Sequence, residues 1–281
     1  MEIVVHNISY AYAEKIIFED AHFVLKAGKI YGLIGENGSG KTTLISLLSR
    51  IQPLQSGEIT NVIQPGLLLQ GVGFYQELSA YENLQLFACE KALPLSQVKE
   101  VLNVTGFSAS LHGQKYKQLS QGYKQRLSIA RSFLTEGNLV LLDEPFSAVD
   151  LPTIRVLKQA IKRYVKETER TILISSHQLK EISDLLDEIL LLKDRQIFSY
   201  TYAEQENREG RYIYLTLSGD DRAEKLLAEN LILRTHRRID QTMEVELRAN
   251  YGVEDMLTWL DQQGIGWTKI EKQVPLEFLF Y

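Results

Sequence analysis

The chain has 281 residues, of which 44% are hydrophobic and 24% are charged, a composition typical of a globular protein with a well-buried core. This length corresponds to about one large or two ordinary domains. The net charge of −5, with acidic and basic residues interspersed, gives no electrostatic reason to expect a nucleic-acid partner. The single cysteine, Cys89, excludes an intrachain disulfide and a cysteine zinc site.

The sequence contains no segment that we expect to enter a membrane. Its start, MEIVVHNISY, lacks the basic residues, the long apolar stretch and the cleavage site of a signal peptide. Apolar runs such as Ile189–Leu192 are far shorter than the roughly 20 residues that span a bilayer. We therefore expect a cytoplasmic protein, and a membrane part of its assembly would come from another chain.

The first part of the chain alternates short β-type runs with helical patterns. Helices are expected at Lys41–Arg50, after a compact apolar run, and around Ile154–Tyr164, where apolar residues recur at helical spacing. Buried strands followed by crossover helices indicate an α/β layer with a parallel core sheet. The strands expected here are Ile3–Ile8, Phe23–Leu25, Ile30–Ile34, Leu139–Leu142, Thr171–Ser175 and Ile197–Tyr200.

Residues 73–125 depart from this alternation, because helical signals at Glu82–Lys91 and Leu95–Val104 are not accompanied by strand-like runs. We expect a helical subdomain there, within a first domain of residues 1–202. After a polar linker, residues 203–281 predict a second, smaller α+β domain. Its expected order β-α-β-β-α-β is the ferredoxin-like pattern, with elements at Tyr212–Ser218, Asp220–Asn230, Leu231–Thr235, Met243–Ala249, Val253–Leu260 and Ile265–Ile270.

The stretch GENGSGKTT, Gly35 to Thr43, matches the phosphate-binding loop G-x-x-x-x-G-K-[ST] between an expected strand and an expected helix. Backbone N–H groups of such a loop point at phosphates from a helix N-terminus that favours anions. Lys41 would reach the β- and γ-phosphates, and the Thr42 hydroxyl would ligate Mg²⁺. The nucleotide-binding residues expected here are Gly35, Asn37, Gly38, Ser39, Gly40, Lys41, Thr42 and Thr43.

A second motif, LVLLDEP, is a buried strand that ends in two acidic residues. In a phosphate-binding-loop protein, a carboxylate at the end of such a strand is placed to hold Mg²⁺, which assigns Asp143 to the metal. Glu144 would then orient or deprotonate the attacking water.

A third motif, LSQGYKQR, lies between the other two, ahead of a helical pattern. This ordered set resembles the nucleotide-binding domain of ATP-binding cassette (ABC) proteins, over about residues 1–200. The family's Leu-Ser-Gly-Gly-Gln signature corresponds to Leu119–Tyr123, which implies that Ser120 and Gly122 clamp the γ-phosphate of ATP held by a second subunit. Gln121 and Tyr123 depart from the signature, so the finer contacts to the nucleotide stay open.

The resemblance implies roles for further residues. Gln70 looks like the Q-loop glutamine that meets Mg²⁺ and the attacking water. Asp150, which ends the segment SAVD, corresponds to the D-loop, and His177 resembles the switch histidine at the γ-phosphate. Tyr12 looks like the aromatic residue that stacks on adenine, with Tyr10 as the alternative.

The family resemblance implies an ATP-hydrolysing subunit that pairs with a second ATPase subunit, as a homodimer or a heterodimer. The pair would bind ATP and Mg²⁺, and it would power a separate integral membrane permease from the inner face of the cell membrane. The continuation Gly-x-Lys-Gln-Arg and the ending PLEFLFY look similar to bacterial peptide, drug and bacteriocin-immunity exporters.

Two other classes compete with a transporter ATPase. Soluble ABC proteins of translation usually carry two cassettes, and those of DNA repair carry long coiled coils, whereas this chain has one phosphate-binding loop and no sustained heptads. A nucleotide sensor without turnover is disfavoured by Glu144, Gln70 and His177. The sequence leaves the transported substrate and the direction of transport open.

Overall fold

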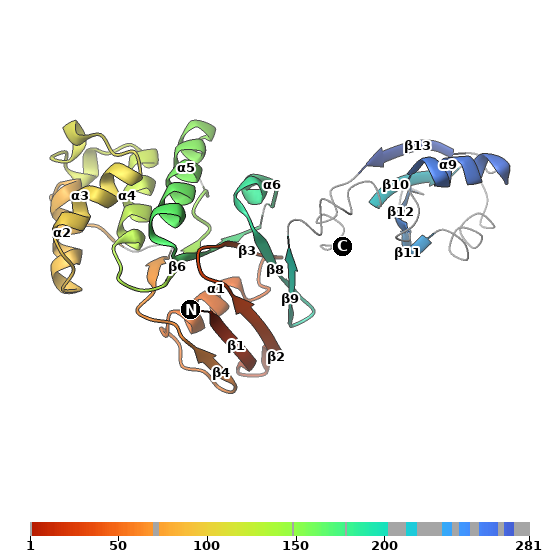
Figure 1. Cartoon of the computed structure of the whole chain (residues 1–281), viewed down its shortest axis with the longest axis horizontal. Coiled ribbons are helices and arrows are strands. Elements are labelled where there is room, and N and C mark those ends of the chain that lie inside the picture. Colours follow the sequence, from red (N-terminus) through yellow and green to blue (C-terminus); the bar gives the residue numbers. More distant parts are fainter. Residues whose placement is uncertain are drawn as a thin grey trace. The chain divides into compact units, whose positions relative to one another are not determined.

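The structure is a computed structural model of the whole chain. It separates into two compact units, Met1–Tyr200 and Thr201–Tyr281 (Figure 1). The residues that it describes are 2–69, 73–147, 149–177, 179–201, 212–217, 232–237, 242–247, 253–263 and 267–272.

The core of the first unit is a six-stranded sheet of order β5-β6-β7-β3-β8-β9. The pairs β5–β6, β6–β7, β7–β3 and β3–β8 are parallel, which confirms the expected parallel core sheet. Strands β3, β6 and β7 are buried along their whole length, as strands covered on both faces must be. The six strands are β3 (Ile30–Gly35), β5 (Gly66–Leu68), β6 (Leu139–Asp143), β7 (Thr171–Ser176), β8 (Glu188–Lys193) and β9 (Gln196–Thr201).

A second, antiparallel sheet of order β2-β1-β4 lies at the start of the chain. Its strands are β1 (Ile3–Tyr12), β2 (Lys15–Leu25) and β4 (Glu58–Thr60), so β1 and β2 are longer than expected from the sequence and β4 was not expected. Asn7 and Asp20 adopt left-handed φ values of 49° and 51° where the register between β1 and β2 shifts. Such bulges interrupt the alternation of buried and exposed residues by which strands are recognised.

The chain between β5 and β6 forms three helices that pack on one another (Figure 1). They are α2 (Ala80–Glu90), α3 (Ser96–Val104) and α4 (Gln121–Phe133). A capping box at Ser79 and Glu82 starts α2. The far end of α4 returns to the sheet, where Gly66 of β5 approaches it so closely that an added Cβ would lie 1.9 Å from the Ser132 carbonyl oxygen. The first turn of α4 therefore belongs to the helical part, while its last turn is anchored on the core sheet.

The remaining helices of the first unit are α1 (Lys41–Leu48), α5 (Leu151–Thr168) and α6 (Leu179–Ile182). Buried aliphatic residues from α1, β3 and the two sheets form one hydrophobic cluster, so the loop before α1 stands on a rigid base. Within the described residues, no helix is both long enough and apolar enough to cross a membrane.

The described strands of the second unit form a four-stranded antiparallel sheet of order β11-β12-β10-β13. Helix α9 (Val253–Gln262) buries Met256 and Leu260. The helix expected at Asp220–Asn230 lies outside the described residues. The strands are β10 (Tyr212–Leu217), β11 (Ile232–Arg237), β12 (Thr242–Leu247) and β13 (Trp267–Lys272).

Candidate nucleotide-binding site

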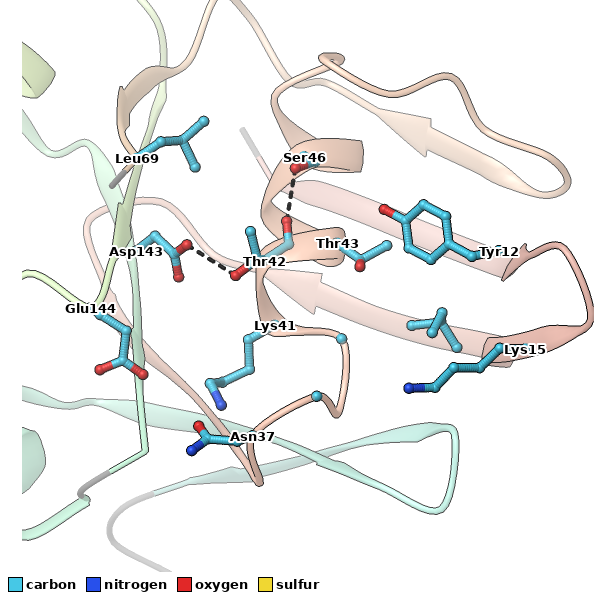
Figure 2. Close-up of a pocket in the computed structure, with 13 residues that line it drawn as sticks. Tyr12, Lys15, Asn37, Lys41, Thr42, Thr43, Ser46, Leu69, Asp143 and Glu144 are labelled. Carbon is cyan, nitrogen blue, oxygen red and sulfur yellow. Dashed lines mark hydrogen bonds between the residues drawn. The ribbon is translucent and has the colours of Figure 1, made fainter. Parts of the chain in front are cut away.

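A cavity of about 550 Å³ opens where β3 and β6 end, beside the first turn of α1 (Figure 2). Loops that follow the carboxyl ends of parallel strands are the usual place for ligands in α/β folds. Figure 2 shows Asp143 and Glu144 on one side of α1 and Tyr12 on the other. The lining residues are Tyr12, Lys15, Ile17, Asn37, Gly38, Gly40, Lys41, Thr42, Thr43, Ser46, Leu69, Asp143 and Glu144.

Glycines give the loop before α1 its shape. Gly38 and Gly40 have left-handed φ values of 82° and 111°, which residues with a Cβ rarely adopt. Gly40 is also the N-cap of α1, and a Cβ there would lie 2.5 Å from Ile17 Cγ2. At Gly35 an added Cβ would lie 2.6 Å from the Ser39 hydroxyl. The backbone can therefore curl tightly enough to expose amide groups to the cavity at the start of the helix.

Lys41 extends from the first residue of α1 and is only 7% exposed. Its ammonium group donates hydrogen bonds to the carbonyl oxygens of Gly35 at 2.7 Å and Glu36 at 3.0 Å. Burial lowers the pKa of Lys41, while the carboxylates of Glu144 and Asp143 act in the opposite direction. The ammonium group is thus held over the loop, where it can donate hydrogen bonds to a bound anion.

The Asp143 carboxylate, 5% exposed, is held by two hydroxyl groups. Thr42 Oγ1 donates to Asp143 Oδ2 at 3.0 Å, the contact drawn in Figure 2, and Ser175 Oγ donates to Asp143 Oδ1 at 2.6 Å. The structure therefore brings together Thr42 and Asp143, the two described residues expected to hold a metal. Both offer the hard oxygen ligands that Mg²⁺ prefers.

Glu144 follows with a left-handed φ of 47°, and its side chain turns towards the switch-histidine position. Glu144 Oε2 lies 3.0 Å from His177 Nδ1, at the end of β7. The Glu144 amide donates to Ser175 Oγ at 2.9 Å. The sequence predicts Ser175 only as part of a strand, without a role in the site. Its signal in the sequence is a pair of hydroxyl residues, Ser175 and Ser176, directly after the apolar run Ile172–Ile174.

Tyr12 stands at the far wall of the cavity, 44% exposed. Its hydroxyl donates to Gln52 Oε1 at 2.8 Å, and Tyr10 packs edge-on against it at 5.2 Å. A hydrogen bond with Thr43 is the main cause that lowers the pKa of Tyr12. These contacts fix the ring at the cavity rim, whereas Tyr10 is buried and does not line the cavity.

Ser120, Gly122 and Asp150 do not line this cavity. Ser120 is the N-cap of α4 and accepts from the Tyr123 amide at 3.4 Å. Asp150 is the N-cap of α5 and accepts from the Thr153 amide at 3.0 Å. Hydrogen bonding with the Thr153 side chain, and secondly with its amide, lowers the pKa of Asp150. Gly122 lies so close to α5 that a Cβ would be 2.6 Å from Thr153 Oγ1. These residues form a second cluster at the starts of α4 and α5.

The two departures from the family signature have different surroundings. Gln121 is exposed. Tyr123 packs edge-on against Phe107 at 5.1 Å, and the Arg126 guanidinium lies 4.8 Å from the centre of its ring. Tyr123 therefore anchors the start of α4 in the helical part. Gln70, the expected Q-loop residue, lies outside the described residues.

The fold and the cavity together define a P-loop ATPase. Residues 18–147 match the family of ABC transporters. The bacitracin transport ATP-binding protein BcrA of Enterococcus faecalis is 30% identical over 264 residues, 87% of this chain and 84% of its own length. The lantibiotic transport ATP-binding protein SrtF of Streptococcus pyogenes is 31% identical over 215 residues, 73% of this chain and 93% of its own length.

Solved structures share the fold. The dimeric ATP-binding cassette MJ0796, solved with ADP and Pi, superposes with a TM-score of 0.62 over 71% of this chain and 98% of its own, at 22% identity. The chain belongs to the ATP-binding subunits of ABC transporters. It is an ATPase of that family, and the sequence-based prediction of a transporter ATPase is confirmed.

Proposed function

We propose that the chain hydrolyses ATP within a head-to-tail pair and thereby drives peptide or drug export through a separate permease. Two copies, or one copy and a relative, would enclose each ATP between the cavity of one subunit and Ser120 and Gly122 of the other. The separation of these residues from the cavity of their own chain supports this arrangement. Asp150 would lie at the same junction, because it caps the helix against which Gly122 packs.

In this proposal, different residues of the cavity bind different parts of the nucleotide. The glycine loop and Lys41 bind the phosphates, with Lys41 exchanging its two loop carbonyls for phosphate oxygens. Tyr12 stacks on the adenine from the opposite wall. Thr42, Asp143 and Gln70 would hold Mg²⁺, which supplies positive charge to the phosphates when bound.

Glu144 is proposed as the general base that takes the proton of the attacking water, and His177 as the group that orients its carboxylate. The observation that carries this assignment is the 3.0 Å contact between Glu144 Oε2 and His177 Nδ1 beside the phosphate loop. The Glu144 side chain is only 17% exposed, so few alternative orientations compete with this contact. A carboxylate held beside the phosphate loop would be placed to take a proton from a water that attacks the γ-phosphate.

The substitution Glu144→Gln tests the proposed chemistry. The amide cannot accept a proton, so hydrolysis should fall at least about a hundredfold while ATP binding persists. With Mg²⁺ and ATP, the variant should accumulate as a dimer in size-exclusion chromatography. Glu136→Gln, which alters an exposed glutamate away from the cavity, is the matched control. Turnover of Glu144→Gln at the wild-type rate would remove Glu144 from the catalytic role.

The names of the relatives guide the proposal for the transported substrate. Because BcrA and SrtF are bacitracin and lantibiotic transport proteins, we propose a peptide antibiotic as the substrate class. The protein would act in the cytoplasm, peripheral at the inner face of the cell membrane, without a nucleic-acid partner. Purification from membranes and identification of the integral subunit that accompanies the chain tests this part.

Residues 203–281 are proposed to form a ferredoxin-like accessory domain after a cassette of residues 1–202 with a helical subdomain at 73–125. In chain order, the four described strands take the spatial order second, third, first, fourth, and all pairs are antiparallel. That order supports the ferredoxin-like assignment. Such a domain would modulate dimerisation or the choice of partner, or would only stabilise the chain.

A further inference from the structure

Ser175 lies inside the core sheet, directly between the two acidic residues of the site. Strands β6 and β7 pair so that Asp143 stands opposite Ser175. The Ser175 hydroxyl donates to Asp143 Oδ1 at 2.6 Å and accepts from the Glu144 amide at 2.9 Å. The buried Ser175 hydroxyl therefore donates a hydrogen bond to the Asp143 carboxylate and accepts one from the backbone amide of Glu144.

A polar side chain at this position is costly unless its hydrogen bonds are needed. Ser175 is fully buried, at 0% exposure, and directly follows three buried aliphatic residues of its strand, Ile172, Leu173 and Ile174. A valine or an alanine would satisfy the packing of a buried parallel strand without a hydroxyl to compensate. Among the described residues, the Ser175 hydroxyl bonds to Asp143 and to the Glu144 amide, so its hydrogen bonds serve the candidate site.

The backbone of Glu144 explains what the hydroxyl does. Glu144 has a φ of 47°, a conformation that residues other than glycine adopt only when their surroundings hold them there. The amide on one side of this residue is held by Ser175. On the other side, Gln125 Nε2 donates to the Pro145 carbonyl oxygen at 2.5 Å. In this backbone conformation the carboxylate reaches His177.

We propose that Ser175 is a positioning residue for ATP hydrolysis. Asp143 accepts the hydroxyl hydrogen, which turns a lone pair of Ser175 towards the Glu144 amide. That hydrogen bond holds the left-handed peptide and aims the Glu144 carboxylate at the position of the attacking water. The inference rests on the proposed catalytic role of Glu144, and it adds a residue that makes no contact with the nucleotide cavity.

The test compares Ser175→Ala, Ser175→Thr and the control Thr171→Val in the full-length protein at saturating Mg²⁺. Thr171 is a buried hydroxyl at the opposite end of the same strand, where it donates to the Lys26 carbonyl oxygen at 3.0 Å. Ser175→Ala should lower kcat about ten- to a hundredfold, because a misaligned catalytic group loses rate steeply. The KM for ATP and the affinity for a fluorescent ATP analogue should change less than about twofold, since the binding contacts remain.

Two further measurements separate positioning from a merely structural role. Ser175→Thr keeps the hydroxyl and should retain kcat, and Thr171→Val should leave kcat unchanged. In a Glu144→Gln background, Ser175→Ala should alter the residual single-turnover rate by less than about twofold, because the group that it positions is already lost. Thermal denaturation of each variant shows whether a loss of rate accompanies a loss of folded protein.

Wild-type kcat in Ser175→Ala would overturn the proposal, as would an equal fold-loss in the wild-type and Glu144→Gln backgrounds. A loss of ATP affinity in proportion to kcat would also overturn it. If Ser175→Ala does not fold, Ser175→Cys, which replaces the hydroxyl with a somewhat larger thiol that is a weaker donor, takes its place in the same comparisons. Normal turnover in Glu144→Gln alone would refute the proposed function, whereas loss in that variant and none in Ser175→Ala refutes only the role of Ser175.

Discussion

Replacing Gly40 with alanine should destabilise the Met1–Tyr200 unit more than replacing Gly38, although both glycines have left-handed backbones. Their φ values are 111° and 82°, so each alanine would carry a comparable conformational strain of about 1–3 kcal/mol. The two positions differ in the space around them. An added Cβ at Gly40 would lie 2.5 Å from Ile17 Cγ2 and 3.0 Å from Phe18 Cζ. At Gly38, no atom of the described residues beyond its two chain neighbours lies within 4 Å of an added Cβ.

The crowding at Gly40 sets the size of the difference. Ile17 and Phe18 are 7% and 0% exposed and belong to the hydrophobic core, so they cannot simply move into solvent. Overpacking of a core costs about 1–3 kcal/mol, here taken as about 2 kcal/mol beyond the shared strain. For a folding unit of this size, each kcal/mol corresponds to about 2–4 °C. Gly40→Ala should therefore unfold about 4–8 °C below Gly38→Ala.

Scanning calorimetry of the full chain without nucleotide measures this difference, because ATP contacts would add a separate effect. The two tryptophans of the chain, Trp259 and Trp267, both lie in the Thr201–Tyr281 unit. Tryptophan fluorescence therefore follows the second unit and should give the same midpoint for both variants. Equal calorimetric midpoints for Gly40→Ala and Gly38→Ala would show that the contact with Ile17 and Phe18 does not shape the loop.

Three further outcomes are expected. Mixing a Lys41→Ala chain with a Ser120→Arg chain should restore part of the ATPase activity that each lacks alone, since one of the two composite sites is then intact; no recovery in a coupled assay would contradict sites shared between subunits. Truncation after Tyr202 should leave ATP affinity unchanged within about twofold in equilibrium binding, while sedimentation shows whether dimer affinity changes; loss of folded protein would contradict a self-sufficient cassette. Burial raises the pKa of Tyr31 from 10.0 to about 12, so the unfolded chain loses this proton first and stability should fall as the pH rises through that window. Denaturant titrations at several pH values should show a shallower fall for Tyr31→Phe, and identical slopes would refute the effect.

Features that depend on residues close together in the chain could be predicted from the sequence. The loop from Gly35 to Thr43 is local, because its glycines and Lys41 act within one strand–turn–helix unit. The core strands can be recognised as continuous apolar runs, because a strand that is buried on both faces does not alternate apolar with polar residues. The family could be identified from the order of the motifs along the chain, because the functional residues of each motif lie within a few positions of one another.

Contacts between residues far apart in the chain became visible only in the folded structure. Ser175 lies in strand β7, and only the pairing of β7 with β6 places it against Asp143 and Glu144. Strand β2 escaped recognition over most of its length because its bulges are settled by pairing with β1, not by local alternation. Likewise, Ser120 and Asp150 cap two helices whose starts meet through Gly122 and Thr153, a contact between residues far apart in the chain. Strand register and helix packing are long-range properties, and the energy that selects them comes from partners that a local pattern does not contain.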